Sequence, residues 1–226
     1  MRSYFLTLAL LVLIGTAEAQ QSSQTAPSSP GSMLYGATVA VTPTPADVLA
    51  SDAYKALIAD LRQGGYVIYL RHAMTAKGAE TAVGDLADCT WQRTLSDAGR
   101  RQAASVGSRL SEQSIPVAAV EASPFCRTRQ TAQLAFGRAP KVNADLFYHP
   151  TQAAEQAAAA NAKLKARLGE RPPPGGNLVL IGHSPTMKAA AAVELSEGEG
   201  AIVKPSGDGT FRIVARLTEA GIMPVP

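Results

Sequence analysis

Histidine and arginine side chains stand directly after short apolar runs in this chain. Arg71 and His72 follow the run at residues 66–70, and His183 follows the run at residues 177–181 after a single glycine. Both runs are typical of strands that are buried on both faces. Because ligands of open α/β sheets bind beyond the carboxyl ends of the strands, we expect these three side chains to share one crevice.

A further arginine, Arg127, begins a helix-like segment at residues 127–136 that follows a third short strand at residues 117–120. Two guanidinium groups in one crevice suit a dianionic phosphate, because arginine pairs with two oxygens at once and keeps its charge. Helix N-termini near Arg127 and Pro185 would add N–H donors for the same anion. The cluster therefore predicts a phosphate site.

The histidines suggest what this site would do with a phosphate. A histidine beside arginines has its cationic form disfavoured, so its imidazole stays neutral near pH 7 and can attack phosphorus. Two histidines could instead bind a metal, but the chain lacks His-x-His, His-Glu-x-x-His and Cys-x-x-Cys spacings, and arginines would repel a cation. Gly-rich nucleotide-binding loops are also missing from the sequence. We expect a phosphohistidine intermediate, no metal and no cofactor.

The elements that must position these residues alternate between strand and helix patterns, which predicts an α/β fold. A late pair of strands around a Gly-Asp-Gly turn makes the expected sheet mixed. The long loop at residues 71–93 is a candidate functional loop. Further helices are expected at residues 46–61, 96–110, 151–168 and from Pro185 onward, and the late strands at residues 201–204 and 211–216.

The N-terminus predicts export. Residues 1–19 read as a signal peptide, with a short apolar core at residues 6–14 and an Ala-Glu-Ala cleavage site, although an uncleaved anchor is the alternative. Residues 20–45, rich in Ser, Pro, Thr and Gln, predict a flexible tether, and residues 46–226 one domain. We expect a periplasmic protein if the source is Gram-negative and a secreted one otherwise. No later segment is long enough for stable membrane insertion.

Composition narrows the function classes. The chain has 226 residues, of which 46% are hydrophobic and 17% charged, with a net charge of +3. These values fit a globular protein and argue against a dedicated nucleic-acid binder. In an oxidising compartment, the even pair Cys89 and Cys126 favours one disulfide, with two free buried thiols as the alternative.

Four ordered segments resemble the motifs of the histidine phosphatase superfamily. The first contains Arg71 and His72, with Ala73 in place of the usual glycine, and the last contains His183. This resemblance implies a phosphoglycerate-mutase-like domain with three α/β/α layers around a mixed, mostly parallel sheet, in an exported short-chain member. The four segments are residues 70–73, 95–103, 123–132 and 180–184.

The resemblance also implies roles for single residues. His72 would be the phosphorylated nucleophile, while Arg71, Arg127 and His183 would hold the phosphoryl oxygens. Arg93 could contact the substrate or cap a loop. A bridge between Cys89 and Cys126 would pin the long loop beside Arg127 and help to preorganise the site.

The sequence lacks a clear match to the general acid of this superfamily. Phosphatases of this superfamily usually need a carboxylic acid to protonate the leaving group, but residues 145–149 contain no glutamate in the expected context. Glu80, Asp85 and Asp88 are candidates by reach, but each taken singly is more simply explained as an ordinary solvated loop carboxylate. His149 could be an ordinary loop residue or could edge the pocket.

The sequence thus predicts an exported phosphatase that hydrolyses a small phosphomonoester or phosphoramidate through a phosphohistidine on His72. A non-catalytic phosphate-binding or anion-binding module of the same fold is the alternative, motivated by the unidentified acid. The physiological substrate and the oligomeric state are left open.

Overall fold

A computed structural model describes residues 44–78, 80 and 84–225. The predicted signal peptide lies outside these residues, and so does the predicted tether except for Thr44 and Pro45. Thr44 is the N-cap of the first helix, which begins at Pro45. Among the described residues, none of the helices combines the length and the apolar character that a bilayer crossing requires.

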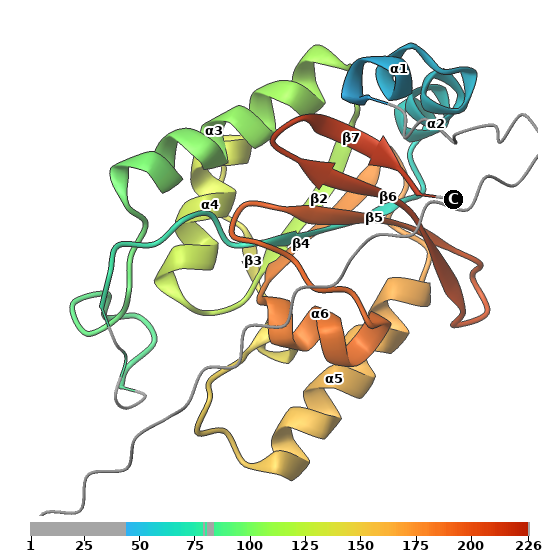
Figure 1. Ribbon diagram of the computed structural model, residues 1–226. Coiled ribbons are helices and arrows are strands. Elements are labelled where there is room, and N and C mark those ends of the chain that lie inside the picture. Colours follow the sequence, from blue (N-terminus) through green and yellow to red (C-terminus); the bar gives the residue numbers. More distant parts are fainter. Residues whose placement is uncertain (1–43, 79, 81–83, 226) are drawn as a thin grey trace, which may run out of the picture. The chain divides into compact units, whose positions relative to one another are not determined.

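The described strands form one mixed sheet in the order β3-β2-β4-β1-β5-β6-β7 (Figure 1). β3, β2, β4 and β1 are parallel, whereas β5, β6 and β7 are antiparallel to their neighbours. The predicted α/β class with a mixed sheet is confirmed. The strands are β1 (Val67–Arg71), β2 (Val117–Ala122), β3 (Lys141–Val142), β4 (Asn177–Gly182), β5 (Gly200–Pro205), β6 (Phe211–Thr218) and β7 (Gly221–Pro224).

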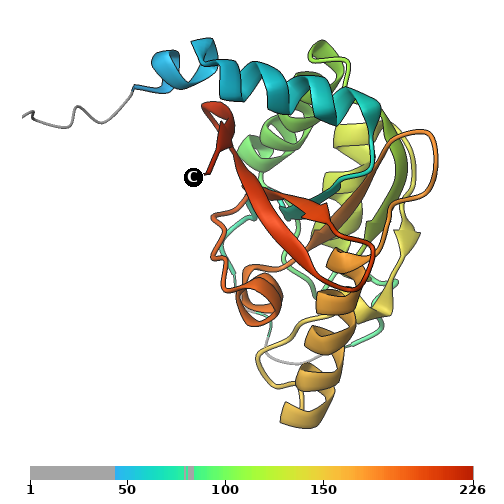
Figure 2. The same cartoon turned by 90° about the vertical axis from the view of Figure 1, so that its right-hand side faces the viewer.

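Helices cover both faces of this sheet, which gives three layers (Figures 1 and 2). α2, α3 and α4 contribute to the hydrophobic cluster on one face, and α5 and α6 contribute to the cluster on the other. The described helices are α1 (Pro45–Ala50), α2 (Asp52–Gln63), α3 (Asp97–Glu112), α4 (Cys126–Phe136), α5 (Ala154–Gly169) and α6 (Ser184–Ala191), with a 3₁₀ turn η1 (Ala144–Leu146).

β1 shows why the central strands are continuous apolar runs. Ile68 and Leu70 belong to the cluster under α2, α3 and α4, whereas Val67 and Tyr69 belong to the cluster under α5 and α6. Successive side chains of a strand point to opposite faces, so a strand covered on both sides must be apolar at every position.

The structure differs from the sequence prediction in three places. The helix expected at residues 46–61 is interrupted at Ser51, whose backbone is extended and whose hydroxyl accepts from the Tyr54 N–H as the N-cap of α2. β3 has two residues, too few for a detectable pattern. β7 ends in Pro224 and occupies a sheet edge, the place where a strand tolerates proline.

Candidate active site

The carboxyl edge of the parallel strands collects the predicted residues. β4 lies between β2 and β1, so the segments that follow these three strands meet at one edge. There they line a cleft of about 320 Å³. The lining includes all of the predicted site residues, namely Arg71, His72, Arg127, His183 and Arg93. The other residues that line the cleft are Gly78, Glu80, Tyr148, His149, Pro150, Ser184 and Pro185.

One of the two ring nitrogens of His72 is engaged in a hydrogen bond. Its side chain is buried, and Nδ1 lies 2.9 Å from the carbonyl oxygen of Ala73. Because a carbonyl oxygen accepts hydrogen bonds and cannot donate them, Nδ1 carries the proton and Nε2 keeps its lone pair. Burial, reinforced by the charges of Arg127, Arg71 and Arg93, lowers the pKa of His72 to about 3. The imidazole is therefore neutral across the physiological pH range.

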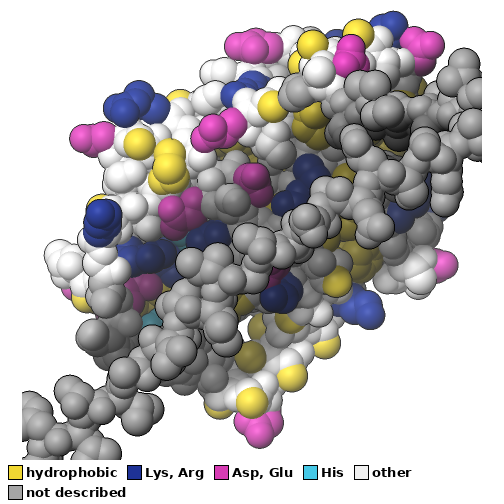
Figure 3. All heavy atoms as spheres, in the orientation of Figure 1, with side chains coloured by type: hydrophobic (Ala, Val, Ile, Leu, Met, Phe, Trp, Pro, Cys, Tyr) yellow, Lys and Arg dark blue, Asp and Glu magenta, His cyan; other side chains and the backbone are white. Residues whose placement is uncertain are grey.

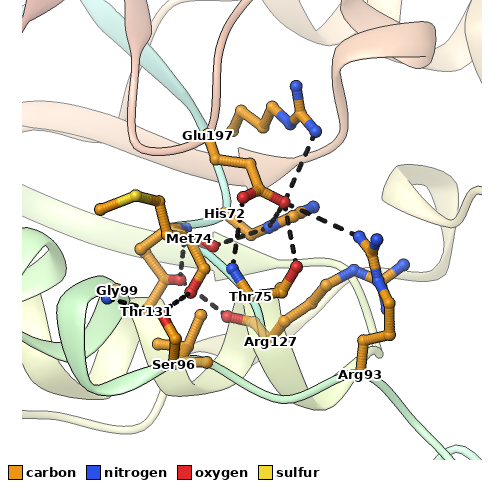
Figure 4. A network of polar contacts seen from close by, with 12 residues as sticks. His72, Met74, Thr75, Arg93, Ser96, Gly99, Arg127, Thr131 and Glu197 are labelled. Atoms are coloured by element: carbon orange, nitrogen blue, oxygen red, sulfur yellow. Dashed lines mark hydrogen bonds and ion pairs between the residues drawn. The ribbon is translucent and has the colours of Figure 1, made fainter. Parts of the chain in front are cut away.

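The backbone after His72 is fastened by side chains from the second and third sequence motifs (Figure 4). Thr131 Oγ1 accepts from the Ala73 N–H at 3.0 Å, and Gln102 Oε1 accepts from the Met74 N–H at 3.0 Å. A Cβ atom at Gly99 would lie 1.8 Å from the Met74 carbonyl oxygen, so glycine allows α3 to approach this segment. These motif positions thus serve to hold the histidine loop.

His183 packs against His72 with ring centroids 5.5 Å apart in an edge-on arrangement. Its Nε2 lies 3.0 Å from Ser123 Oγ, and its backbone N–H donates to the Tyr69 hydroxyl at 2.9 Å. Burial lowers the pKa of His183 well below its usual value, and the nearby His72 and arginines act in the same direction. His72 and His183 are therefore both neutral.

Arg127 has hydrogen-bonding capacity left for an anion. Its Nη1 donates to Glu80 Oε1 at 2.7 Å, and its guanidinium stands 4.2 Å over the ring of Phe125. Within the part of the chain that the structure describes, its Nε is buried without a hydrogen-bond partner. A buried donor without a partner is costly, and it marks this arginine as a candidate anion ligand.

The structure separates the three candidate carboxylates. Glu80 lines the cleft, where its Oε1 accepts from Arg127 and from the Arg93 backbone N–H at 2.9 Å. Asp85 and Asp88 do not line it and instead accept backbone N–H groups of their own turn. Reach along the chain could not distinguish these three, because the sequence does not show which part of the loop faces the cleft.

A second carboxylate, that of Glu197, was missed by the sequence analysis. It comes from the connection between α6 and β5 and lies among Arg71, Arg93 and His72 (Figure 4). Its segment carries no periodic pattern, and no signal in the sequence connects it with the histidine motifs. Arg93 thus lines the cleft and also forms an ion pair with Glu197.

Cys89 and Cys126 are joined by a disulfide, and the alternative of two free thiols is excluded. Arg129 supports this bridge, because its Nη2 lies 3.1 Å from Cys126 Sγ and donates to the Leu86 carbonyl at 2.9 Å. The long loop is thus attached to the N-terminal turn of α4, next to Arg127.

His149 edges the cleft, as one of its two predicted alternatives stated. Its ring stacks on Phe125, and its Nδ1 lies 2.8 Å from Thr151 Oγ1. On the surface, basic and acidic side chains lie next to the histidine atoms (Figure 3). The lining of the cleft therefore combines arginine side chains with the Glu80 carboxylate, which partly balances their charge.

Comparisons with known proteins agree with this geometry. The family model of the histidine phosphatase superfamily (branch 1) matches residues 67–146, which contain three of the four motifs but not His183. This match confirms the resemblance and supports phosphatase chemistry. No curated protein sequence matches the chain.

Solved structures of the same fold give a consistent result. The protein histidine phosphatase SixA, in complex with tungstate, is 19% identical in sequence to this chain and superimposes with a TM-score of 0.50. The match covers 67% of this chain and 95% of the SixA chain. The phosphoserine phosphatase of Entamoeba histolytica, in complex with 3-phosphoglyceric acid, is 15% identical in sequence to this chain, with a TM-score of 0.50. The match covers 69% of this chain and 98% of the phosphoserine phosphatase chain. These likenesses establish the fold.

Proposed function

With residues 67–146 assigned to the histidine phosphatase superfamily, we propose that this protein hydrolyses a small phosphomonoester or phosphoramidate through a phosphohistidine on His72. The observation that carries the proposal is the hydrogen bond from His72 Nδ1 to the Ala73 carbonyl. It leaves the Nε2 lone pair available in a cleft lined by arginines. A neutral, oriented imidazole next to fixed positive charge is what an attack on phosphorus requires.

In the first step, the lone pair of His72 Nε2 forms a bond to phosphorus. The bond from phosphorus to the leaving group breaks, and its electron pair stays on the leaving atom. Arg71, Arg127 and His183 hold the non-bridging oxygens and stabilise the charge that they carry in the transition state. Water then attacks phosphorus, the P–N bond breaks, and its electron pair returns to Nε2.

The leaving group needs a proton, and we assign its delivery to Glu80. Among the described residues, the two hydrogen bonds that this carboxylate accepts both use Oε1, and we assign the proton to Oε2. Oε2–H protonates the leaving atom, and the resulting carboxylate takes a proton from water in the second step.

The arginines supply the positive charge that a metal provides in other phosphatases, so the proposed reaction is metal-independent. Arg71 and Arg127 keep their charge at any physiological pH and match paired oxygens. Within the described residues, no three side chains of His, Cys, Asp or Glu gather into a group that could hold a metal ion.

We also propose that the enzyme acts outside the cytoplasm. The apolar core and the Ala-Glu-Ala site of residues 1–19 support export, and the Cys89–Cys126 disulfide is typical of an oxidising compartment. Cell fractionation and N-terminal sequencing test this proposal: a mature chain that begins at Gln20 supports it, and an intact Met1 in the cytoplasm contradicts it.

The test of the reaction is phosphate release from 4-nitrophenyl phosphate between pH 4 and 8, for the wild type and His72→Ala. Activity that the substitution abolishes supports the proposal, and acid-labile labelling of the wild type by the phosphoryl group would identify the phosphohistidine. Equal activity in both proteins would refute His72 as the nucleophile. Phosphate binding without turnover or labelling, with phosphoramidates also tested, would favour the non-catalytic module.

A further inference from the structure

Glu197 is placed beside the nucleophile by the register of the sheet. β5 runs antiparallel to β1 and begins where β1 ends, with Gly200 opposite Leu70. The Gly198 N–H donates to the His72 carbonyl and the Arg71 N–H to the Glu199 carbonyl, both at 2.9 Å. The backbone on the C-terminal side of Glu197 is therefore bonded to the strand end that carries the histidine.

One oxygen of the Glu197 carboxylate, Oε1, lies close to several polar side chains (Figure 4). Oε1 accepts from the Thr75 hydroxyl at 3.0 Å and lies 3.6 Å from Arg71 Nη2 and 3.7 Å from Arg93 Nη2. It also lies 3.9 Å from His72 Nδ1, the nitrogen that carries the proton. The Glu197 side chain is 24% exposed and does not line the cleft. It faces the nucleophile on the Nδ1 side, opposite the attacking Nε2.

This position matters because the charge of His72 changes during the reaction. When Nε2 bonds to phosphorus while Nδ1 keeps its proton, the imidazole becomes a cation. A carboxylate near Nδ1 stabilises that cation, as a buried carboxylate stabilises the imidazolium of the general-base histidine in serine hydrolases. The same negative charge repels the dianionic phosphoryl group before the reaction and so opposes its binding.

We infer that Glu197 is a positioning residue that favours phosphorylation of His72 and weakens ground-state binding of the phosphate dianion. It orients the Arg71 and Arg93 guanidiniums and provides the counter-charge for the phosphorylated imidazole. This inference rests on the proposed function, because it concerns the phosphohistidine formed there. It extends that function by assigning phosphate binding to the arginines and stabilisation of the phosphorylated imidazole to Glu197.

The two effects of Glu197 have opposite signs, which makes the inference testable with Glu197→Gln. This substitution keeps the shape and removes the charge. We expect kcat for 4-nitrophenyl phosphate to fall by about tenfold or more, while KM and the Kd for inorganic phosphate fall several-fold. A purely structural role would weaken phosphate binding and turnover together.

Glu199→Gln is the matched control. Glu199 lies in the same connection, and its carboxylate contacts Arg216 and the Ser196 N–H instead of the cleft. Removing its charge should leave kcat and phosphate affinity unchanged. Glu197→Asp is the second variant: it retains the charge, so we expect phosphate affinity near that of the wild type with a smaller loss in kcat.

Unchanged kcat in Glu197→Gln, or weaker phosphate binding in that variant, would overturn the inference. If Glu197→Gln does not fold, phosphate affinity tighter than wild type in Glu197→Asp would overturn it as well. Failure of the proposed function looks different, because then the wild type itself would show no turnover that His72→Ala abolishes.

Discussion

The backbone N–H of Cys126 donates a 2.7 Å hydrogen bond to Oε1 of Gln92. Gln92 is buried, and its Nε2 donates to the carbonyls of Leu86 and Asp88 within its own loop. The loop that contains Glu80 and Arg93 is thus joined to Cys126, the first residue of α4, both by this hydrogen bond and by the disulfide from Cys89. The position of Arg127, the next residue, depends on both.

Loss of the disulfide should reduce both stability and activity. We expect the Cys89→Ser/Cys126→Ser variant to lose about 4 kcal/mol of unfolding free energy at most, because the bridge closes a loop across 37 residues. Its kcat/KM should fall as well, since the bridge holds the loop beside Arg127. Denaturant unfolding and steady-state kinetics of oxidised and reduced wild type and of the variant measure this. Equal kcat/KM in all three would show that Gln92 suffices to hold the loop.

Acid should destabilise the native state through His72 and His183. Their pKa values are lowered in the folded protein, that of His72 to about 3, whereas unfolded histidines titrate near 6.5. Between these values the unfolded chain binds more protons, so stability falls as pH decreases from about 6.5 toward 3. Each histidine contributes a slope of at most about 1.4 kcal/mol per pH unit.

Unfolding by denaturant at several pH values checks this slope. His72→Asn is the useful variant, because its amide can still donate to the Ala73 carbonyl but does not titrate. Its stability should depend less steeply on pH below 6.5 than that of the wild type. Identical slopes would mean that His72 is not buried as a neutral group.

Removal of the Glu80 proton donor should affect poor leaving groups most. For Glu80→Gln we expect a loss of about 100-fold or more in kcat/KM with alkyl phosphates and a small loss with 4-nitrophenyl phosphate, whose leaving group needs no proton. Asp88→Asn, which changes an exposed carboxylate of the same loop, is the control and should behave as wild type. Equal losses on both substrates would instead assign Glu80 to the positioning of Arg127.

Replacement of Arg127 by lysine should weaken phosphate binding without unfolding the protein. Lysine keeps the charge but lacks the fork of donors, including the buried Nε that has no partner among the described residues. The loss of one charge-assisted hydrogen bond of about 1.5–3 kcal/mol corresponds to a roughly 10- to 150-fold weaker Kd for inorganic phosphate. Calorimetric titration measures this, and Arg138→Lys, which changes an exposed arginine just beyond the C-cap of α4, is the control. Wild-type affinity in Arg127→Lys would remove Arg127 from the phosphate site.

Local sequence patterns determined much of this fold. The runs before His72 and His183 predict their strands, because a strand covered on both faces must be apolar throughout. Ser96 predicts the start of α3, where its hydroxyl accepts from the Gly99 N–H, and Gly137 predicts the end of α4, where the backbone is left-handed. Each of these signals acts within a few residues, so sequence alone contains it.

The sequence by itself also predicted that the histidines and arginines after three of the strands meet in one cleft, because parallel strands bring their carboxyl ends to one edge. Only the tertiary structure decided which carboxylates join them. Glu80 was one of three candidates, and the fold of the loop selected it. Glu197 had no signal at all, because its place beside His72 depends on the pairing of β5 with β1. The contact between Glu197 and His72 is set by strand register and packing, and no local pattern encodes it.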